Sequence, residues 1–177
     1  DMQAMNFIRP AIANMGEMHN GVGKFSDPKH NPAVASPSAT ARALNVVQRW
    51  FVEETRLGIP VEFSNEGIRG ANYRKTVNFP ADIGLGATWD RDLVGEVGRV
   101  VNAETAALGY RNVYGVILDL ARDPRWGRVV ECYGEDPYLV SEYGVRMATA
   151  LKTNGVIATA KHFAVYSIPK GGRDGRV

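Results

Sequence analysis

Short apolar runs, separated by longer stretches of helical periodicity or by loops, limit this chain to few folds. The short, mostly apolar segments that can form strands lie at 61–63, 82–86, 115–119 and 156–160. Runs of this length without polar alternation are typical of strands buried on both faces of a parallel sheet. Strands that alternate with helices imply crossover connections between parallel neighbours. The sequence therefore predicts an α/β fold in which parallel strands alternate with helices.

Three stretches have apolar residues at the three- and four-residue spacing of a helix with one buried face. Ser38 or Thr40 can cap the first of them, Thr88 or Asp90 can cap the second, and Asp136 followed by Pro137 is a typical start for the third. A glycine such as Gly109, placed after the last apolar residue, can end a helix. The expected helices span about 38–57, 88–109 and 136–155.

Composition excludes several classes of protein. Of the 177 residues 45% are hydrophobic, which is enough for the core of one domain. The 21 basic and 19 acidic residues are spread along the chain, and the net charge of +2 predicts neither a nucleic-acid nor a membrane partner. The single cysteine, Cys132, leaves no partner for an internal disulfide. No apolar run approaches the roughly 20 residues of a membrane span, and Asp1-Met2-Gln3 does not open a signal peptide.

The whole chain, residues 1–177, is expected to belong to one domain, of which it holds only a part. Residues 1–37 form an irregular N-terminal segment, residues 38–165 hold the strand–helix units, and residues 166–177 form a truncated loop. The N-terminal segment contains His19 and His30. No third ligand stands at a useful spacing from this pair, so the sequence predicts no metal site.

The most densely charged stretch of the chain follows the strand predicted at 115–119. Three arginines and five carboxylates lie within 119–136, and Pro124, Gly127 and Gly134 prevent a helix through it. Long ordered loops with charged and aromatic residues often carry binding and catalytic sites. The alternative is a surface loop whose charges pair with one another.

Ionisable side chains follow three of the predicted strands. Glu66 comes after the first, the charged loop after the third, and Lys161-His162 after the fourth. In a β/α barrel the carboxyl ends of the parallel strands carry the active site. Carboxylate, guanidinium, ammonium and imidazole groups together favour a neutral polyhydroxylated ligand, because such a ligand needs both donors and acceptors. Two simpler explanations stay open: Glu66 can cap the next element, and a lone histidine such as His162 is more often structural.

Two phosphate-binding interpretations find less support. The run Gly84-Leu85-Gly86-Ala87-Thr88-Trp89 has two glycines of a dinucleotide-binding loop. The third glycine position is Trp89, which is too large for close helix–strand packing. The arginines of the 119–136 loop are interleaved with acids that would repel a phosphate.

Five groups of residues follow one another in an order that resembles a known family. They are Leu57-Gly58-Ile59-Pro60, Asn65-Glu66-x-x-Arg69-Gly70, Ala87-Thr88-Trp89-Asp90, Ala121-Arg122-Asp123-Pro124-Arg125-Trp126-Gly127-Arg128 with Tyr133-Gly134-Glu135-Asp136-Pro137, and Gly155-Val156-Ile157-Ala158-Thr159-Ala160-Lys161-His162-Phe163. Over about residues 40–165 the chain resembles the amino-terminal domain of glycoside hydrolase family 3. That family includes β-glucosidases, β-xylosidases and β-N-acetylhexosaminidases.

The resemblance implies the first part of a TIM-type (β/α) barrel, incomplete in this chain. It also implies the substrate-binding portion of a retaining exo-acting β-glycosidase, similar to β-glucosidases, that hydrolyses terminal β-linked sugars in carbohydrate metabolism. The nucleophile and the acid/base carboxyl would lie outside the chain, so no catalytic residue and no cofactor is expected within it. The expected partners are an oligosaccharide or β-glycoside substrate and either a second copy or the missing part of the enzyme. A secreted or periplasmic location is expected, and the alternative is a non-catalytic carbohydrate-binding module of the same fold.

The resemblance carries over to four residues of a substrate site. Glu66 matches the acid that binds hydroxyl groups of the sugar in the −1 subsite, and Arg128 matches the arginine that reaches the same sugar. Lys161 and His162 match the pair that hydrogen-bonds its hydroxyl groups. Two positions depart from the family pattern, because Glu66 stands where many β-glucosidases have Asp and Arg69 stands where His is common.

Overall fold

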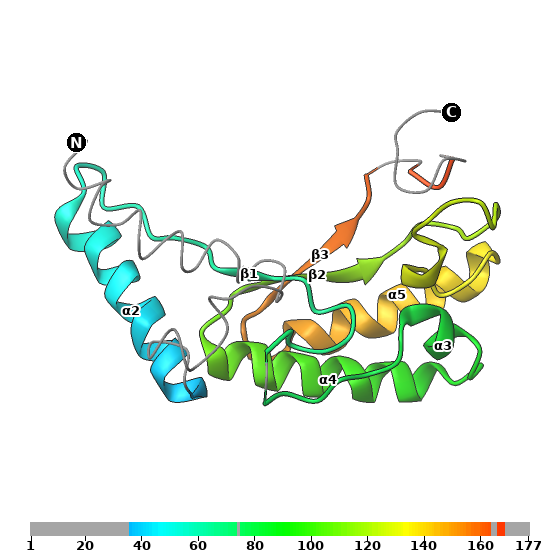
Figure 1. The fold of residues 1–177 in the computed structure, drawn as a ribbon, viewed down its shortest axis with the longest axis horizontal. Helices are drawn as coiled ribbons and strands as arrows, with labels where there is room; N and C mark the ends of the chain where they lie inside the picture. The colour runs from blue at the N-terminus through cyan, green and yellow to red at the C-terminus, as the bar shows by residue number, and fades with distance from the viewer. Residues whose placement is uncertain (1–35, 74, 164–165, 169–177) are drawn as a thin grey trace.

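The computed structural model describes residues 36–73, 75–163 and 166–168. In this part of the chain three strands form one parallel sheet in the order β1-β2-β3. Their bounds are β1 Ser64–Asn65, β2 Asn112–Ile117 and β3 Ile157–Lys161. Helices connect successive strands (Figure 1), so the predicted α/β fold with parallel strands is confirmed.

The helices lie on one side of this sheet or extend away from it. Their bounds are α2 Pro37–Glu54, α3 Asp82–Gly86, α4 Arg91–Leu108 and α5 Pro137–Leu151, with short 3-10 helices η4 Val129–Glu131 and η5 Lys152–Asn154. Helices α4 and α5 pack side by side beneath the strands, whereas α2 projects away from the sheet (Figure 1). None of the helices in the described residues is long and apolar enough to span a bilayer.

Side-chain caps determine where the two long helices beneath the sheet begin. The Asp90 carboxylate accepts hydrogen bonds from two amides of the first turn of α4, each at 3.0 Å. The Asp136 carboxylate accepts one from the Leu139 amide at 2.7 Å, and Pro137 occupies the first turn of α5. Gly109 ends α4 in the left-handed conformation, with φ of 99°. These starts and this end agree with the sequence predictions.

One apolar core joins the sheet to helices α4 and α5. Five of its side chains, at most 1% exposed, are Val94, Val101, Val113, Val116 and Leu151. Burial of an aliphatic side chain of this size stabilises a fold by about 1.5–3 kcal/mol. Because these residues come from α4, β2 and α5, the core fixes the central strand against both helices and thereby fixes the position of its carboxyl end.

The strand predicted at 82–86 is wrong, because this segment forms helix α3. Its buried residues are Asp82, Leu85 and Gly86, which have the three- and four-residue spacing of a helical face. A five-residue apolar run is too short for its periodicity to separate a strand from a helix. The helical conformation also places Asp82 wholly inside the protein, at 0% exposure.

Three other boundaries differ from those predicted. The strand expected at 61–63 begins only at Ser64, although the Phe63 carbonyl oxygen accepts a hydrogen bond from the Arg111 amide at 2.8 Å. Ser36, not Ser38 or Thr40, caps α2 by accepting a bond from the Ala39 amide at 3.2 Å. Strand β2 begins at Asn112 rather than 115.

Gly86 allows α3 to lie directly on the chain that follows η4. A Cβ atom at position 86 would lie 1.7 Å from the Tyr133 carbonyl oxygen, which is far inside van der Waals contact. At Gly95 in α4, by contrast, the nearest foreign atom to such a Cβ is a side-chain nitrogen of Arg99 at 3.9 Å. The two helical glycines therefore differ in the space available for a methyl group.

We predict that Gly86→Ala lowers the free energy of unfolding by about 3 kcal/mol or more, because the backbone must move to admit the methyl group. Gly95→Ala is the matched control, and we expect it to be neutral or to stabilise the chain by up to about 1 kcal/mol through helix propensity. Urea titration followed by tryptophan fluorescence measures both. Equal stability of the two variants would contradict the close packing of α3 on the 133 backbone.

The β3 side of the sheet exposes apolar surface in the described part of the chain. Exposure is 48% for Ile157, 43% for Leu118 and 64% for Val145, and Ile157 departs from the buried strand predicted there. A cavity of about 490 Å³ between β2, β3 and α5 is lined by Leu118, Val145 and Ala160 among others. An open edge beside exposed apolar side chains favours association with another chain.

We predict that the chain on its own self-associates and binds a dye that reports apolar surface, as measured by analytical sedimentation and dye fluorescence. Val145→Lys places a charge on this surface and is expected to reduce both signals. Val46→Lys is the matched control, because Val46 is 66% exposed but lies on α2. A monodisperse wild-type monomer with low dye binding and a cooperative melt would contradict this prediction.

Candidate functional site

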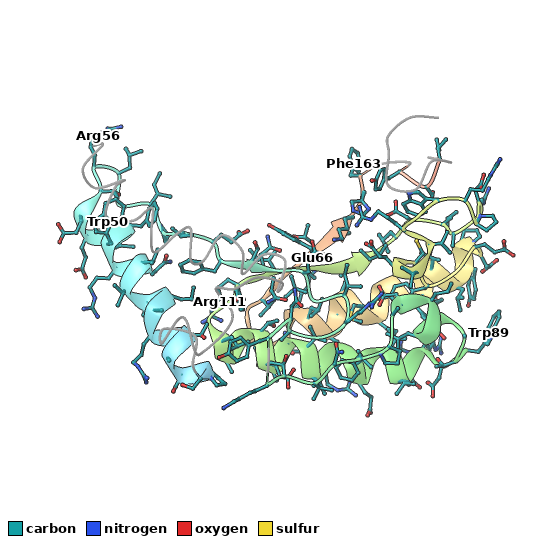
Figure 2. The ribbon with its side chains drawn as sticks, viewed as in Figure 1. Trp50, Arg56, Glu66, Trp89, Arg111 and Phe163 are labelled. Carbon is teal, nitrogen blue, oxygen red and sulfur yellow. The ribbon has the colours of Figure 1, made fainter. Side chains whose placement is uncertain are left out.

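Glu66 and Lys161 meet at the carboxyl ends of the outer strands. Glu66 directly follows β1, and Lys161 is the last residue of β3. Lys161 Nζ donates to Glu66 Oε2 at 2.6 Å, and the two side chains are only 13% and 25% exposed. The buried Asn65 shapes this turn, because its side chain donates to the Ala71 carbonyl oxygen at 2.7 Å and accepts from the Gly67 amide at 3.0 Å. Figure 2 shows Glu66 above the middle of the sheet, on the side opposite the long helices.

His162 lies against an acid from the neighbouring strand. Its Nδ1 atom is 2.5 Å from Asp119 Oδ2, and the Asp119 side chain is 3% exposed. The backbone aligns the two residues, because the Leu118 amide donates to the Lys161 carbonyl oxygen at 2.8 Å just beyond the paired strands. The peptide bond between Lys161 and His162 is cis.

Arg128 is held by Glu131, three residues further along the charged loop. Its Nε and Nη2 atoms donate to Glu131 Oε1 and Oε2 at 2.9 and 2.5 Å, a two-point contact that fixes the plane of the guanidinium group. These hydrogen bonds raise the pKa of Arg128 above its already high usual value, so the group stays charged. Trp126, 1% exposed, anchors this part of the loop in a small cluster with Ile117 and Cys132.

Tyr166 connects Arg128 to the histidine. The Arg128 guanidinium carbon lies 5.2 Å from the centre of the Tyr166 ring, within the range of a cation–π contact. Tyr166 also makes an edge-on contact with His162, and the centres of the two rings are 4.8 Å apart. The structure therefore brings Arg128 and His162 to one ring, and Glu66 and Lys161 to one ion pair.

An open cavity of about 430 Å³ lies beside these groups. It is lined by Asp119, Lys161 and His162, together with apolar residues that include Leu118 and Phe163. Phe163 is fully exposed and lies beyond the end of β3 (Figure 2). Glu66 and Arg128 do not line this cavity directly. Its lining thus combines a lysine, a histidine and an aspartate with an aromatic residue, a composition that suits a ligand with both hydroxyl groups and an apolar face.

A second ion pair within the charged loop joins Asp123 to Arg125, of the kind that the surface-loop alternative expects. The Asp123 carboxylate accepts from Arg125 Nε and Nη2 at 2.9 and 2.7 Å, and the Arg125 side chain is 63% exposed. This pair stiffens the exposed part of the loop. Arg125 and Arg128 therefore have different partners. Arg125 pairs with Asp123, whereas Arg128 pairs with Glu131 and contacts the Tyr166 ring.

Cys132 is not a candidate nucleophile. Burial raises the pKa of its thiol to about 12, and the nearby carboxylates Asp119, Glu131 and Asp82 contribute to this rise. The thiol therefore stays protonated at neutral pH. Among the described residues no group of three or more His, Cys, Asp or Glu side chains could hold a metal ion, and His19 and His30 lie outside those residues.

Four further residues belong to this polar cluster but are absent from the sequence-based list. In the sequence, Asp119 and Glu131 are two of the five acids of the charged loop. Their spacing does not indicate that they pair with His162 and Arg128. Asp82 stands in a run interpreted as a strand, where a single acid among apolar residues is the one available signal. Tyr166 lies in a segment without periodicity and gives no signal of its own.

We predict that Glu131→Gln destabilises the chain by about 1–3 kcal/mol, because it leaves the mostly buried Arg128 without a charged partner. Glu96→Gln is the matched control. Glu96 pairs with Arg99 at the same three-residue separation, but those side chains are 70% and 59% exposed. Exposed pairs of this kind contribute about 0–1 kcal/mol. Urea denaturation measures both variants, and an equal loss of stability in the two would contradict the anchoring role of Glu131.

Comparison with known proteins adds an independent result. A family model described as the N-terminal domain of glycosyl hydrolase family 3 matches residues 15–176. A periplasmic beta-glucosidase of Salmonella typhimurium is 34% identical over 143 residues, which cover 77% of this chain and 18% of the relative. A beta-xylosidase of Formosa agariphila is 38% identical over 134 residues, which cover 68% of this chain and 18% of the relative.

Solved structures of similar proteins share the fold. An exo-1,3/1,4-beta-glucanase of a Pseudoalteromonas species matches with a TM-score of 0.73 and 32% identity, over 82% of this chain and 20% of that protein. A beta-glucosidase of Listeria innocua, in complex with isofagomine, matches with a TM-score of 0.65 and 38% identity, over 72% of this chain and 18% of that protein. The chain thus spans about a fifth of the length of these proteins. By the match of its sequence to the family model over residues 15–176, the chain belongs to glycosyl hydrolase family 3 and forms part of the N-terminal domain of that family.

Proposed function

We propose that this chain is the sugar-binding portion of a retaining exo-acting β-glycosidase that removes terminal β-linked sugars. The observation that carries the proposal is the pairing of Lys161 with Glu66 at 2.6 Å and of His162 with Asp119 at 2.5 Å, all at the carboxyl ends of parallel strands. Each pair fixes the orientation of its two side chains, which are mostly buried. They can therefore donate to and accept from the hydroxyl groups of one sugar ring.

The same geometry favours a binding role over a catalytic one for this part of the enzyme. Retaining hydrolysis needs a nucleophilic carboxylate and an acid/base carboxyl about 5 Å apart on either side of the scissile bond. Glu66, Asp119 and Glu131 each hold a cation or an imidazole, which fixes them as partners of other side chains. We infer that both catalytic carboxyls come from outside this chain.

The proposed ligand is the terminal sugar of an oligosaccharide or another β-glycoside. The relatives are named as a beta-glucosidase and a beta-xylosidase. The length of the Glu66 side chain bears on which of these two sugars fits the site. This side chain is one methylene longer than the Asp of many β-glucosidases, which would take up space near the C6 group of a hexose. The test therefore uses both kinds of sugar.

A secreted or periplasmic location is part of the proposal. Relatives named as periplasmic and as lysosomal beta-glucosidases support an extracytoplasmic place of action. The competing function is a non-catalytic carbohydrate-binding module with the same site, and the two are separated by whether hydrolysis appears once the rest of the barrel is supplied.

We predict that the purified chain binds methyl β-glucoside or methyl β-xyloside, detected by saturation-transfer NMR, but does not hydrolyse the p-nitrophenyl derivatives. Glu66→Gln is expected to weaken binding by roughly tenfold or more, because it removes a charge-assisted contact of about 1.5–3 kcal/mol. Glu96→Gln, on the exposed face of α4, is the control and should bind as the wild type does.

Two results would contradict this proposal. If the folded chain bound neither sugar, the proposed sugar-binding function would be wrong. Turnover by the purified chain that Glu66→Gln abolishes would show that a catalytic carboxylate lies within these residues.

A further inference from the structure

Asp82 is a buried acid whose carboxyl oxygens lack partners in the described residues. It is the first residue of α3 and is 0% exposed. Neither Oδ1 nor Oδ2 has a hydrogen-bond partner there. An ionised carboxylate in such a place is costly, because neither water nor a donor compensates for its lost hydration. The neutral acid is the form that this environment favours.

The nearest charges identify what Asp82 lies against. Burial raises the pKa of Asp82 well above its usual value, and the negative charge of Glu131 raises it further, while the positive charges of Arg69 and Lys161 oppose the shift. Conversely, the Asp82 charge raises the pKa of the buried Tyr133 phenol, after the larger effect of burial. Asp82 therefore lies near Glu131, and its helix α3 packs against the η4 segment that contains Glu131.

The titratable groups coupled to Asp82 come from three parts of the chain. They are Glu131 from η4 with Cys132 and Tyr133 directly after it, Arg69 from the loop after β1, and Lys161 from β3. Helix α5, which also packs against α3, contributes Tyr143, and Tyr143 contacts Tyr133 edge-on. Two of the cations are committed, Lys161 to Glu66 and Arg128 to Glu131. A charged Asp82 would compete with Glu66 for Lys161 and would repel Glu131, the partner of Arg128.

We propose that Asp82 is a positioning residue of the sugar site, a carboxylic acid that stays neutral so that Glu131 holds Arg128 and Glu66 holds Lys161. Asp82 itself is inaccessible and does not touch the ligand. Ionisation would place a second negative charge near Glu131, the partner of Arg128, and would attract Lys161 away from Glu66, so binding weakens as the pH rises. This inference rests on the proposed sugar-binding function.

Stability against pH tests the neutral acid without any ligand. A folded-state pKa above that of the unfolded chain, about 3.9, means that wild-type stability is highest below that value. It is then lost as the pH rises toward the folded-state pKa. Asp82→Asn mimics the neutral acid and avoids this loss. We expect the midpoint urea concentration of the variant to rise relative to that of the wild type as the pH increases above about 4. Asp92→Asn, in an exposed pair with Arg146, is the control and should show no such trend.

Sugar binding against pH tests the positioning role. With methyl β-glucoside and methyl β-xyloside as probes, wild-type affinity should fall by up to about tenfold per pH unit once Asp82 ionises, because only the neutral form is competent. Asp82→Asn should bind as the wild type does at about pH 5 and keep that affinity at higher pH. Parallel pH profiles of wild type and variant would overturn the positioning role while leaving the sugar site intact. Absence of binding by both would overturn the proposed function and the positioning role together.

A direct titration covers the case in which Asp82→Asn does not fold. The Asp82 carboxyl carbon of the wild type, labelled with carbon-13, should keep the chemical shift of a protonated acid at pH values where an ordinary Asp, with a pKa of about 3.9, is ionised. A carboxyl that titrates near its ordinary value of about 4 would overturn the proposal.

Discussion

The ion pair between Lys161 and Glu66 is the interaction on which the arrangement of the strand ends depends. It joins β3 to the turn after β1 across the central strand, which the ladder alone does not do, because β1 and β3 each pair only with β2. Gly115 makes this possible: a Cβ atom there would lie 2.9 Å from the Gly67 backbone and 3.2 Å from the Glu66 carbonyl oxygen. The turn that carries Glu66 can thus lie directly on β2. Removing either charge would leave the other mostly buried without a partner, which costs more than the pair itself contributes.

The remaining charges of the cluster follow the same rule of local neutrality. Asp119 lies against His162, and Glu131 holds Arg128, each within 2.9 Å. Asp82 is the exception, since it is buried deeper than the others and finds no donor in the described residues. The protonation proposed for Asp82 would remove its charge. A cluster with mixed signs and little net charge matches a neutral polyhydroxylated ligand better than an anion, in agreement with the net charge of +2 for the whole chain.

Sequence patterns predicted those features whose physical cause is local. The caps at Asp90 and Asp136 and the helix end at Gly109 depend only on neighbouring residues. Glu66 and Lys161 were identified because each comes at the end of a predicted strand, and the parallel topology then brings them together. The segment 82–86 was assigned to the wrong element, because its conformation depends on packing against Tyr133, far along the chain. The partners of His162 and Arg128 could not be predicted. The 119–136 loop contains five acids, and the sequence does not indicate which of them contacts either residue.

The paired state of the proposed site also determines how it would discriminate between ligands. Lys161 uses one of its three N–H bonds on Glu66, and Arg128 uses two of its five on Glu131. A sugar can therefore add hydrogen bonds to both cations without breaking the pairs that orient them. Little reorganisation is needed on binding, which reduces the cost of forming the complex. The same arrangement penalises a sugar that lacks a hydroxyl group at the matching position, because its binding removes water from these N–H bonds and leaves them unpaired. Selectivity in this site would then arise from the donors left over by the ion pairs, and the charges themselves would serve mainly to hold those donors in place.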